Sequence, residues 1–394
     1  MTTTTDDAAA LLEAARQLRP VLAERAHEAE LNRRIHDETI EALHDTGLLR
    51  AIRPRYADGY GIGMVDLIKI SAELSRGCPS TSWLFTVLSG IQPLGLATLG
   101  QEGQKDVYGE KGTRTVVCSV LNFSSGTAIP HEDGYLVNGK WGYASGSLHA
   151  DYMAAGVLLH DEDGQPTEPA IAFFPIPEAT VLDTWKVAGM AATGSNTVVA
   201  ENVFVPARRV GLVSAWQGRE HDPKADPYER FPLWPYFTLG FTGILLGAAE
   251  EIFHAVVDDM KKRGVTYFDF PKKTDSAVLV ERIGEVRMSI DGAWLHAMRS
   301  GQELDELTKK GPLDYKLRAR MRADAAQVVK QLRDSVSSLL TIAGAAPFAS
   351  SNPIQRLWRD LNVASGHSTL NTYGVFEAYG RAYLGLEPNI TDQI

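Results

Sequence analysis

Apolar residues recur every three or four positions over the first part of the chain, which is the spacing of one face of an α-helix. One such stretch starts near Leu11, a second opens at Asp37 and ends near Gly47, and two more cover 65–74 and 84–99. The pattern predicts a helical domain over residues 1–112.

Residues 113–212 show a different pattern, in which short β-branched and aromatic runs alternate with Gly, Pro, Asn and Asp. Runs of this length between turn residues are typical of strands. They predict a small antiparallel β domain, with strands at 116–120, 135–137, 152–159, 170–174 and 198–205.

Residues 213–234 contain several prolines and aromatic residues but no strong periodicity. This link is a candidate lid or substrate wall, and a plain connection between domains fits the sequence nearly as well. Helical spacing returns over residues 235–394, where the apolar stripes predict a C-terminal four-helix bundle. The stripes cover 237–260, 279–293, 317–339 and 352–371. The chain is therefore expected to be mainly α with a middle β domain.

The net charge of −10 argues against a general nucleic-acid binder or a protein drawn to anionic membranes. Cys78 and Cys118 lie far apart and outside any CxxC pattern, which fits a reducing compartment and disfavours a disulfide framework. We find no signal peptide and no apolar run long enough to span a bilayer. We expect a cytoplasmic protein that has no nucleic-acid or membrane partner.

The stretch Asn352–Asn371 combines a helix signal with groups that chemistry can use. One face of the helix is apolar, while Arg356, Arg359 and Asp360 occupy the other side. Gly366 loosens or ends the helix and leaves His367 near its C-terminal end. By itself, the stretch favours a capped helix with a surface histidine over a functional site.

Three further segments carry candidate chemistry, each with a plain structural alternative. Residues 141–147 place the hydroxyls of Ser145 and Ser147 beside small residues, where a flat ligand can approach. Residues 190–197 offer Gly194 among hydroxyl and amide side chains, as many β-turns also do. Arg263 ends a basic run after a helix, where it can bind phosphate or simply interact with the helix dipole.

Several site types find no support in the sequence. No GxGxxG follows a strand and there is no GxxxxGK[ST], so neither a Rossmann nor a P-loop nucleotide site is indicated. The histidines form no HxxxH or HExxH pattern, and no serine lies in a GxSxG elbow. We therefore expect no metal site.

Taken in order, these stretches resemble the acyl-CoA dehydrogenase fold. More closely they resemble the flavin-dependent monooxygenases built on it, such as p-hydroxyphenylacetate hydroxylase, steroid-ring phenol hydroxylases and amino-sugar nitrososynthases. The resemblance covers about 31–386. Its most specific pieces are CPSTSW (78–83), WGYASGSLHADY (141–152), GMAATGSNTVV with FVP (189–206) and NPIQRLWRDLNVASGH (352–367).

The resemblance implies an N-terminal helical domain, a middle β-barrel-like domain and a C-terminal four-helix bundle, assembled as a homotetramer. Flavin, as FMN or FAD, would lie between the β domain and the bundle, partly enclosed by a neighbouring subunit. The residues carried over to the cofactor site are Trp83, Tyr143, Ser145, Ser147, Thr193, Ser195, Arg263, Gln355 and Arg359. Of these, Ser145 would lie near N5 and Arg263 would bind the phosphate.

One departure separates the two branches of this fold. Dehydrogenases commonly carry a catalytic glutamate after their RxWRDxK-type helix, which removes the α-proton of a thioester. In this sequence the aligned position is Ser368, beside His367. Serine cannot act as that base, so the sequence favours the oxygenase. An acyl-CoA dehydrogenase with a relocated base is the alternative.

The resemblance also implies a mechanism. Reduced flavin from a separate reductase would react with O₂ to a C4a-hydroperoxide, which transfers one oxygen atom to a small molecule. His367 would orient or deprotonate the substrate, a role that suits a pKa near neutrality. Some hydroxylases carry an extra histidine where this chain has Ile91-Gln92-Pro93, which leaves both hydroxylation of a phenol or indole and N-oxygenation of an amine or amino sugar open.

Overall fold

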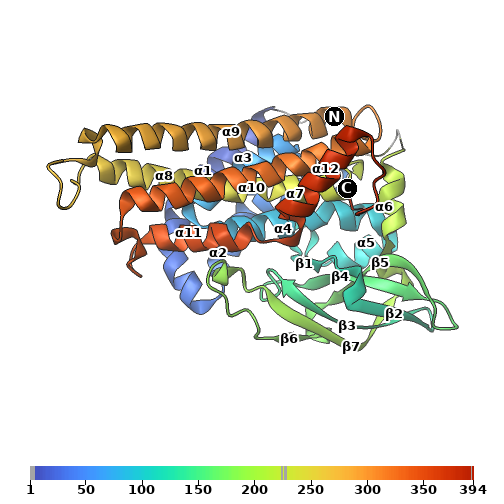
Figure 1. Ribbon diagram of the computed structural model, residues 1–394. Coiled ribbons are helices and arrows are strands. Elements are labelled where there is room, and N and C mark those ends of the chain that lie inside the picture. The colour runs from blue at the N-terminus through green and yellow to red at the C-terminus, as the bar shows by residue number, and fades with distance from the viewer. Residues whose placement is uncertain (1–4, 223–224, 226–228, 392) are drawn as a thin grey trace.

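The computed structural model describes residues 5–222, 225, 229–391 and 393–394. Long helices form a bundle, and a β domain packs against one side of it, with α4 and α5 in between (Figure 1). The N-terminal part contributes α1 (Thr5–Asn32), α2 (Asp37–Asp45), α3 (Met64–Gly77), α4 (Pro79–Thr98) and α5 (Gln101–Tyr108). The predicted end of the second helix is confirmed, because Gly47 adopts a left-handed conformation just after α2 (φ +78°).

Helix α4 is the central element of the N-terminal part. It starts at Pro79, whose missing N–H is tolerated in the first turn, and nearly all of its residues are buried. A helix that is buried on every side has partners on every side. Through this helix, Trp83 comes close to both the β domain and the C-terminal helices.

The β domain forms one eight-stranded sheet in which β6, β7, β3, β2, β4, β5 and β8 follow one another and β1 pairs with β4. It is not purely antiparallel as expected, because β1 and β2 both run parallel to β4. The strands are β1 (Val117–Val120), β2 (Gly126–His131), β3 (Gly134–Ala144), β4 (Tyr152–His160), β5 (Pro166–Pro175), β6 (Thr180–Leu182), β7 (Asn196–Pro206) and β8 (Val210–Leu212).

The C-terminal part differs from the prediction in detail. The first apolar stripe is divided at Phe241 into two helices, a final helix follows the expected bundle, and a short helix lies inside the segment treated as a link. The elements are α6 (Val213–Arg219), α7 (Leu233–Gly240), α8 (Thr242–Met260), α9 (Ala277–Leu307), α10 (Tyr315–Ala343), α11 (Pro353–Ala364) and α12 (Thr372–Leu384).

The segment Leu233–Met260 is long and apolar enough to cross a membrane, a feature that the sequence analysis missed. Inside the protein, 72% of its most apolar window is buried. Buried core helices commonly have the same length and apolar composition, so the segment is weak evidence for a membrane span.

The N-terminal helices join the bundle through a close contact between α3 and α8. A Cβ atom at Gly247 would lie 2.0 Å from the Ala72 carbonyl oxygen, and one at Gly243 would lie 2.4 Å from that of Ile68. The Ser75 hydroxyl donates to the Ile244 carbonyl at 2.6 Å, which fixes the register of the two helices. Glycine is therefore required on this face of α8.

We expect Gly247→Ala to lower the free energy of unfolding by about 1–3 kcal/mol, because the added methyl group overlaps a backbone oxygen. The matched control is Gly284→Ala, at an exposed position of α9 where an added Cβ meets nothing within 4 Å. That variant should gain about 0.5–1 kcal/mol from helix propensity. Thermal and urea denaturation compare the two, and a tolerated Gly247→Ala would contradict the close contact.

Candidate functional site

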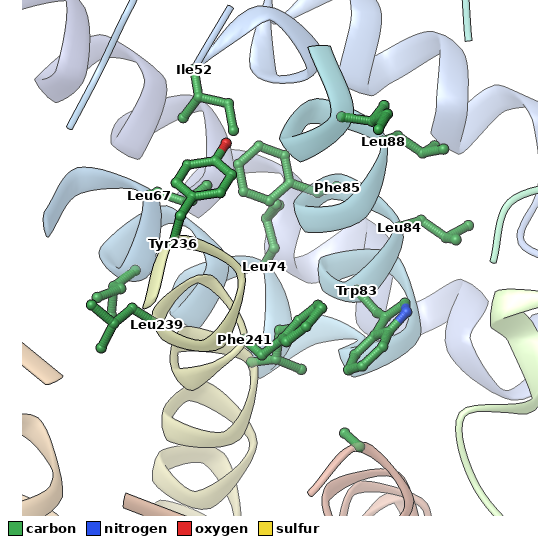
Figure 2. Packing of buried hydrophobic residues seen from close by; sticks show 14 of the residues in the cluster. Ile52, Leu67, Leu74, Trp83, Leu84, Phe85, Leu88, Tyr236, Leu239 and Phe241 are labelled. Atoms are coloured by element: carbon green, nitrogen blue, oxygen red, sulfur yellow. The ribbon is translucent and has the colours of Figure 1, made fainter. Parts of the chain in front are cut away.

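Three aromatic rings meet where α4, the α7–α8 junction and the end of α11 converge. Trp83 and Phe241 stack with ring centroids 4.5 Å apart and an interplanar angle of 6° (Figure 2). The His367 ring lies 5.4 Å from Trp83 and 4.9 Å from Phe241. We call Trp83, Phe241 and His367 the ring cluster. It forms an apolar wall with one polar side chain.

A row of hydroxyl groups begins at the ring cluster and continues into the β domain. The Trp83 indole Nε1 donates to Ser145 Oγ at 3.0 Å. Ser145 Oγ lies 2.7 Å from Ser195 Oγ, which lies 2.6 Å from Thr193 Oγ1. Thr193 Oγ1 then donates to the Met190 carbonyl at 2.8 Å. We call Ser145, Ser195 and Thr193 the hydroxyl chain, and all three residues are buried.

The backbone before Ser145 explains how its hydroxyl reaches this place. The β3–β7 register shifts between Trp141 and Ala144, and Tyr143 has a φ of +63°. A left-handed aromatic residue is uncommon, and such residues concentrate at functional sites. After this bulge, the Gly146 amide donates to the Thr193 carbonyl at 3.1 Å, which ties the two halves of the site together.

Helix α11 holds the other side of the hydroxyl chain. Asp360 Oδ1 accepts the Met190 amide at 2.5 Å, and Arg359 donates to the Ala188 carbonyl. Met190 itself is left-handed (φ +57°), so its turn depends on these contacts. Asp360 and Arg356 are buried, which corrects the expectation that they occupy a polar outer side. Burial raises the pKa of Asp360 to about 7.

The structure brings five of the predicted residues together: Trp83, Ser145, Thr193, Ser195 and His367. Ser147 is also buried, and its hydroxyl has no hydrogen-bond partner among the residues that the structure describes.

The remaining predicted residues lie outside this group. Tyr143 is 73% exposed and packs edge-on against Trp185. Gln355 lies on α11, where it accepts from Arg359 Nε at 2.7 Å. Arg263 follows α8, where the connection to α9 projects beyond the bundle (Figure 1), and it pairs with Asp259 at 3.0 Å.

His367 differs from the expected titrating base. Burial lowers the pKa of His367 to about 4, so the ring is neutral at physiological pH. Nδ1 accepts the Thr369 amide at 3.4 Å and lies 2.9 Å from Thr369 Oγ1, so the tautomer that satisfies both contacts has its ring hydrogen on Nε2. No described residue accepts a hydrogen bond from Nε2. The expectation of a pKa near neutrality was wrong, and in this state the side chain is a hydrogen-bond donor.

Sequence reasoning missed the role of Phe241, which belonged to an apolar stripe and looked like any core residue. It also missed Met190 and Asp360 as the support of the hydroxyl chain. The sequence did show Asp360 as a carboxylate within a predicted helix. However, only the fold shows that Asp360 and Met190 touch.

Two family models match the chain: acyl-CoA dehydrogenase, N-terminal domain, over residues 5–114, and acyl-CoA dehydrogenase, C-terminal domain, over residues 239–372. The flavin-dependent monooxygenase oxygenase subunit HsaA of Rhodococcus jostii is 31% identical over 95% of this chain and 98% of its own. The chain belongs to the flavin-dependent monooxygenases of the acyl-CoA dehydrogenase fold. It is the oxygenase component of a two-component system and uses reduced flavin.

Two other relatives support this family assignment. The FADH(2)-dependent resorcinol hydroxylase oxygenase component of a Rhizobium species is 31% identical, over 92% of this chain and 91% of its own. The structure of XiaF from a Streptomyces species in complex with FADH2 and glycerol superposes with a TM-score of 0.93 at 31% identity, covering 98% and 97% of the two chains.

The residues of this flavin-dependent monooxygenase fit a flavin. The buried, unpartnered Ser147 hydroxyl and the hydroxyl chain supply polar contacts for ring heteroatoms, and the ring cluster supplies an apolar boundary. Within the part of the chain that the structure describes, no hydrogen bond or ion pair joins a carboxylate to the ring cluster or the hydroxyl chain. The alternative of an acyl-CoA dehydrogenase with a relocated base is not favoured.

Proposed function

We propose that this oxygenase hydroxylates a small aromatic molecule, using FADH2 from a separate flavin reductase. The observation that carries the proposal is the ring cluster, because stacked aromatic side chains with one polar group suit a flat substrate with a polar substituent. The FADH2 bound by XiaF and the name of the resorcinol hydroxylase favour FAD over FMN and an aromatic substrate over an amino sugar.

The chain's own residues have separable tasks in this proposal. Bound reduced flavin supplies the capacity to activate O₂. Ser145, Ser147, Thr193 and Ser195 hold the isoalloxazine, and the buried surroundings exclude water. His367 Nε2 donates to the substrate's oxygen and sets which ring position faces the flavin. The Trp83 and Phe241 rings limit the substrate to a thin, apolar shape.

We also propose that the protein works in the cytoplasm as a homotetramer, without a membrane or nucleic-acid partner. The connection between α8 and α9 supports the assembly, because Tyr267 is fully exposed and Phe268 is 67% exposed there. Exposed aromatic residues on a projecting segment fit a protein contact. In the tetramer, this segment would bring Arg263 to the flavin of a neighbouring subunit.

The test supplies the protein with enzymatically reduced FAD or FMN, ¹⁸O₂ and a panel of phenols, indoles and amino sugars. The expected result is one ¹⁸O atom in an aromatic product, with FADH2 more effective than FMNH2. Incorporation only into an amino sugar would overturn the aromatic assignment. Anaerobic bleaching of the flavin by an acyl-CoA would instead support a dehydrogenase.

Arg263→Ala should weaken binding of reduced FAD and FMN about tenfold, because a charge-assisted bond to phosphate is lost. Reduced riboflavin, which has no phosphate, is the internal control and should bind both proteins equally. Anaerobic fluorescence titration measures the affinities, and size-exclusion chromatography with light scattering reports the assembly. An equal loss for riboflavin would show that Arg263 does not bind the phosphate.

A further inference from the structure

Arg322 is a buried arginine of α10 that has no acidic partner. It is 7% exposed, and no carboxylate of the described residues forms an ion pair with it. Its guanidinium donates instead to two backbone carbonyls, that of Thr369 at 3.2 Å and that of Gln393. Burial lowers the pKa of Arg322, because the charge is kept away from water. A buried charge of this kind is costly, and here it joins two segments that follow α10 in the sequence.

Thr369 connects this guanidinium to His367. It lies in the short turn Ser368–Leu370, where its carbonyl accepts from Arg322. Its Oγ1 lies 2.9 Å from His367 Nδ1, and its amide donates to the same nitrogen at 3.4 Å. Within the described residues, these are the hydrogen bonds of the His367 side chain. The position of Thr369 therefore sets how the imidazole is turned within the ring cluster.

Residues 393 and 394 keep the Arg322 guanidinium in place. Ile394 is 3% exposed and packs with Ala319 of α10 and Ala378 of α12. This end of the chain lies beside α12 (Figure 1). Gln393 is thereby held where its carbonyl accepts from Arg322. Because a guanidinium is planar and its donors have fixed directions, two acceptors define its orientation, which one acceptor would not.

We propose that Arg322 is a positioning residue for the oxygenation: through Thr369 it holds His367 with Nε2 turned towards the substrate. This role rests on the proposed function, in which His367 Nε2 donates to the substrate's oxygen. Hydrogen bonds weaken steeply as their angle departs from linear, so a small turn of the imidazole misdirects the substrate. Ile394 supports the same arrangement by fixing the second acceptor of Arg322.

Arg322→Met keeps a long side chain but removes the hydrogen bonds to both carbonyls. We expect product formed per O₂ consumed to fall about three- to tenfold, the effect of one buried hydrogen bond, with hydrogen peroxide as the other product. The affinity for reduced flavin should stay native, because the contacts of Arg322 lead to His367 and not to the hydroxyl chain. Arg322→Lys can still donate to one carbonyl and should recover part of the product.

Arg333→Met is the matched control, at an exposed position of the same helix. It should form as much product per O₂ as the native enzyme. Ile394→Asp places a charge in an apolar site and releases Gln393, so it should repeat the loss seen with Arg322→Met. Thermal denaturation shows whether each variant is folded, and Arg322→Lys replaces Arg322→Met if the latter is not.

Combining Arg322→Met with His367→Ala separates positioning from a merely structural role. If Arg322 acts through His367, its replacement should cost no further product once the imidazole is absent, so the two effects are not additive. Native product per O₂ in Arg322→Met, or an equal loss with and without His367, would overturn the proposal while the proposed function stands. A His367→Ala enzyme with native product per O₂ would instead overturn the role of His367 in the proposed function. An oxygen electrode and chromatography measure these ratios.

Discussion

Replacing His367 by alanine should lower kcat/KM for the aromatic substrate by about 10- to 100-fold, the value of a buried hydrogen bond to a polar ligand group. The ring lies against both members of the stacked Trp83–Phe241 pair, and no described residue accepts a hydrogen bond from its Nε2–H. Without it, the substrate loses its orienting contact. More reduced flavin should then be consumed with hydrogen peroxide as the product instead of the hydroxylated compound.

A glutamine at position 367 shows whether His367 acts as a hydrogen-bond donor or as a general base. His367→Gln places an amide N–H near the position of Nε2 but cannot accept a proton, so it should recover most of the coupling between O₂ consumption and product formation. If His367 were the base, the glutamine variant would be as poor as the alanine variant. Product per O₂ consumed, measured with an oxygen electrode and chromatography, distinguishes these outcomes.

The pH dependence gives a second view of the same residue. Burial holds the pKa of His367 at about 4, so the ring stays neutral from pH 5.5 to 8. The native enzyme and His367→Gln should therefore have kcat/KM profiles of the same shape in this range. A step near pH 6.5 that is present only in the native enzyme would contradict the neutral donor.

The fold was predictable because its signals are local and repeated. Helical stripes and strand runs occupy long parts of the chain, and their order is characteristic. Details that depend on one residue were less visible. The break at Phe241 lies inside a continuous apolar pattern, and the parallel pairing of β1 and β2 with β4 depends on contacts distant in sequence.

The sequence predicted several residues of the candidate site, but not the hydrogen bonds between them. Ser145, Thr193 and Ser195 stood out as hydroxyls beside glycine, yet only the fold shows that Trp83, Ser145 and Ser195 hydrogen-bond to one another. The state of His367 was predicted wrongly, because its pKa is lowered by burial, and the two rings it packs against, Trp83 and Phe241, are far from it in sequence. Sequence gives the residue types, whereas burial sets their protonation.

Asp360→Ala should destabilise the protein by about 2–4 kcal/mol, because the buried Met190 amide loses its acceptor. A Cβ at Gly189 would lie 2.5 Å from the Arg359 carbonyl carbon and 2.8 Å from the Asp360 nitrogen, so the loop has little room to find another partner. Because Met190 ends the hydroxyl chain, reduced flavin should also bind less tightly. Thermal denaturation and anaerobic flavin titration measure the two effects.

Asp360→Asn keeps an oxygen acceptor of the same size, so it should retain most of the stability and flavin affinity. It also removes an ionisable group, and the pKa of Asp360 determines how that group changes the stability of the protein with pH. Burial raises the pKa of Asp360 from 3.8 to about 7, so the folded protein holds a proton that the unfolded chain releases. Its contribution to stability is full below pH 3.8 and is lost as the pH rises to 7.

The native protein should consequently lose stability relative to Asp360→Asn between pH 4 and 7, by up to about 1.4 kcal/mol per pH unit. The asparagine variant should match or exceed the native protein at pH 8. If Asp360→Asn is as unstable as Asp360→Ala at every pH, the charge of Asp360 beside Arg356, and not its hydrogen bond to Met190, is what holds α11 to the β domain.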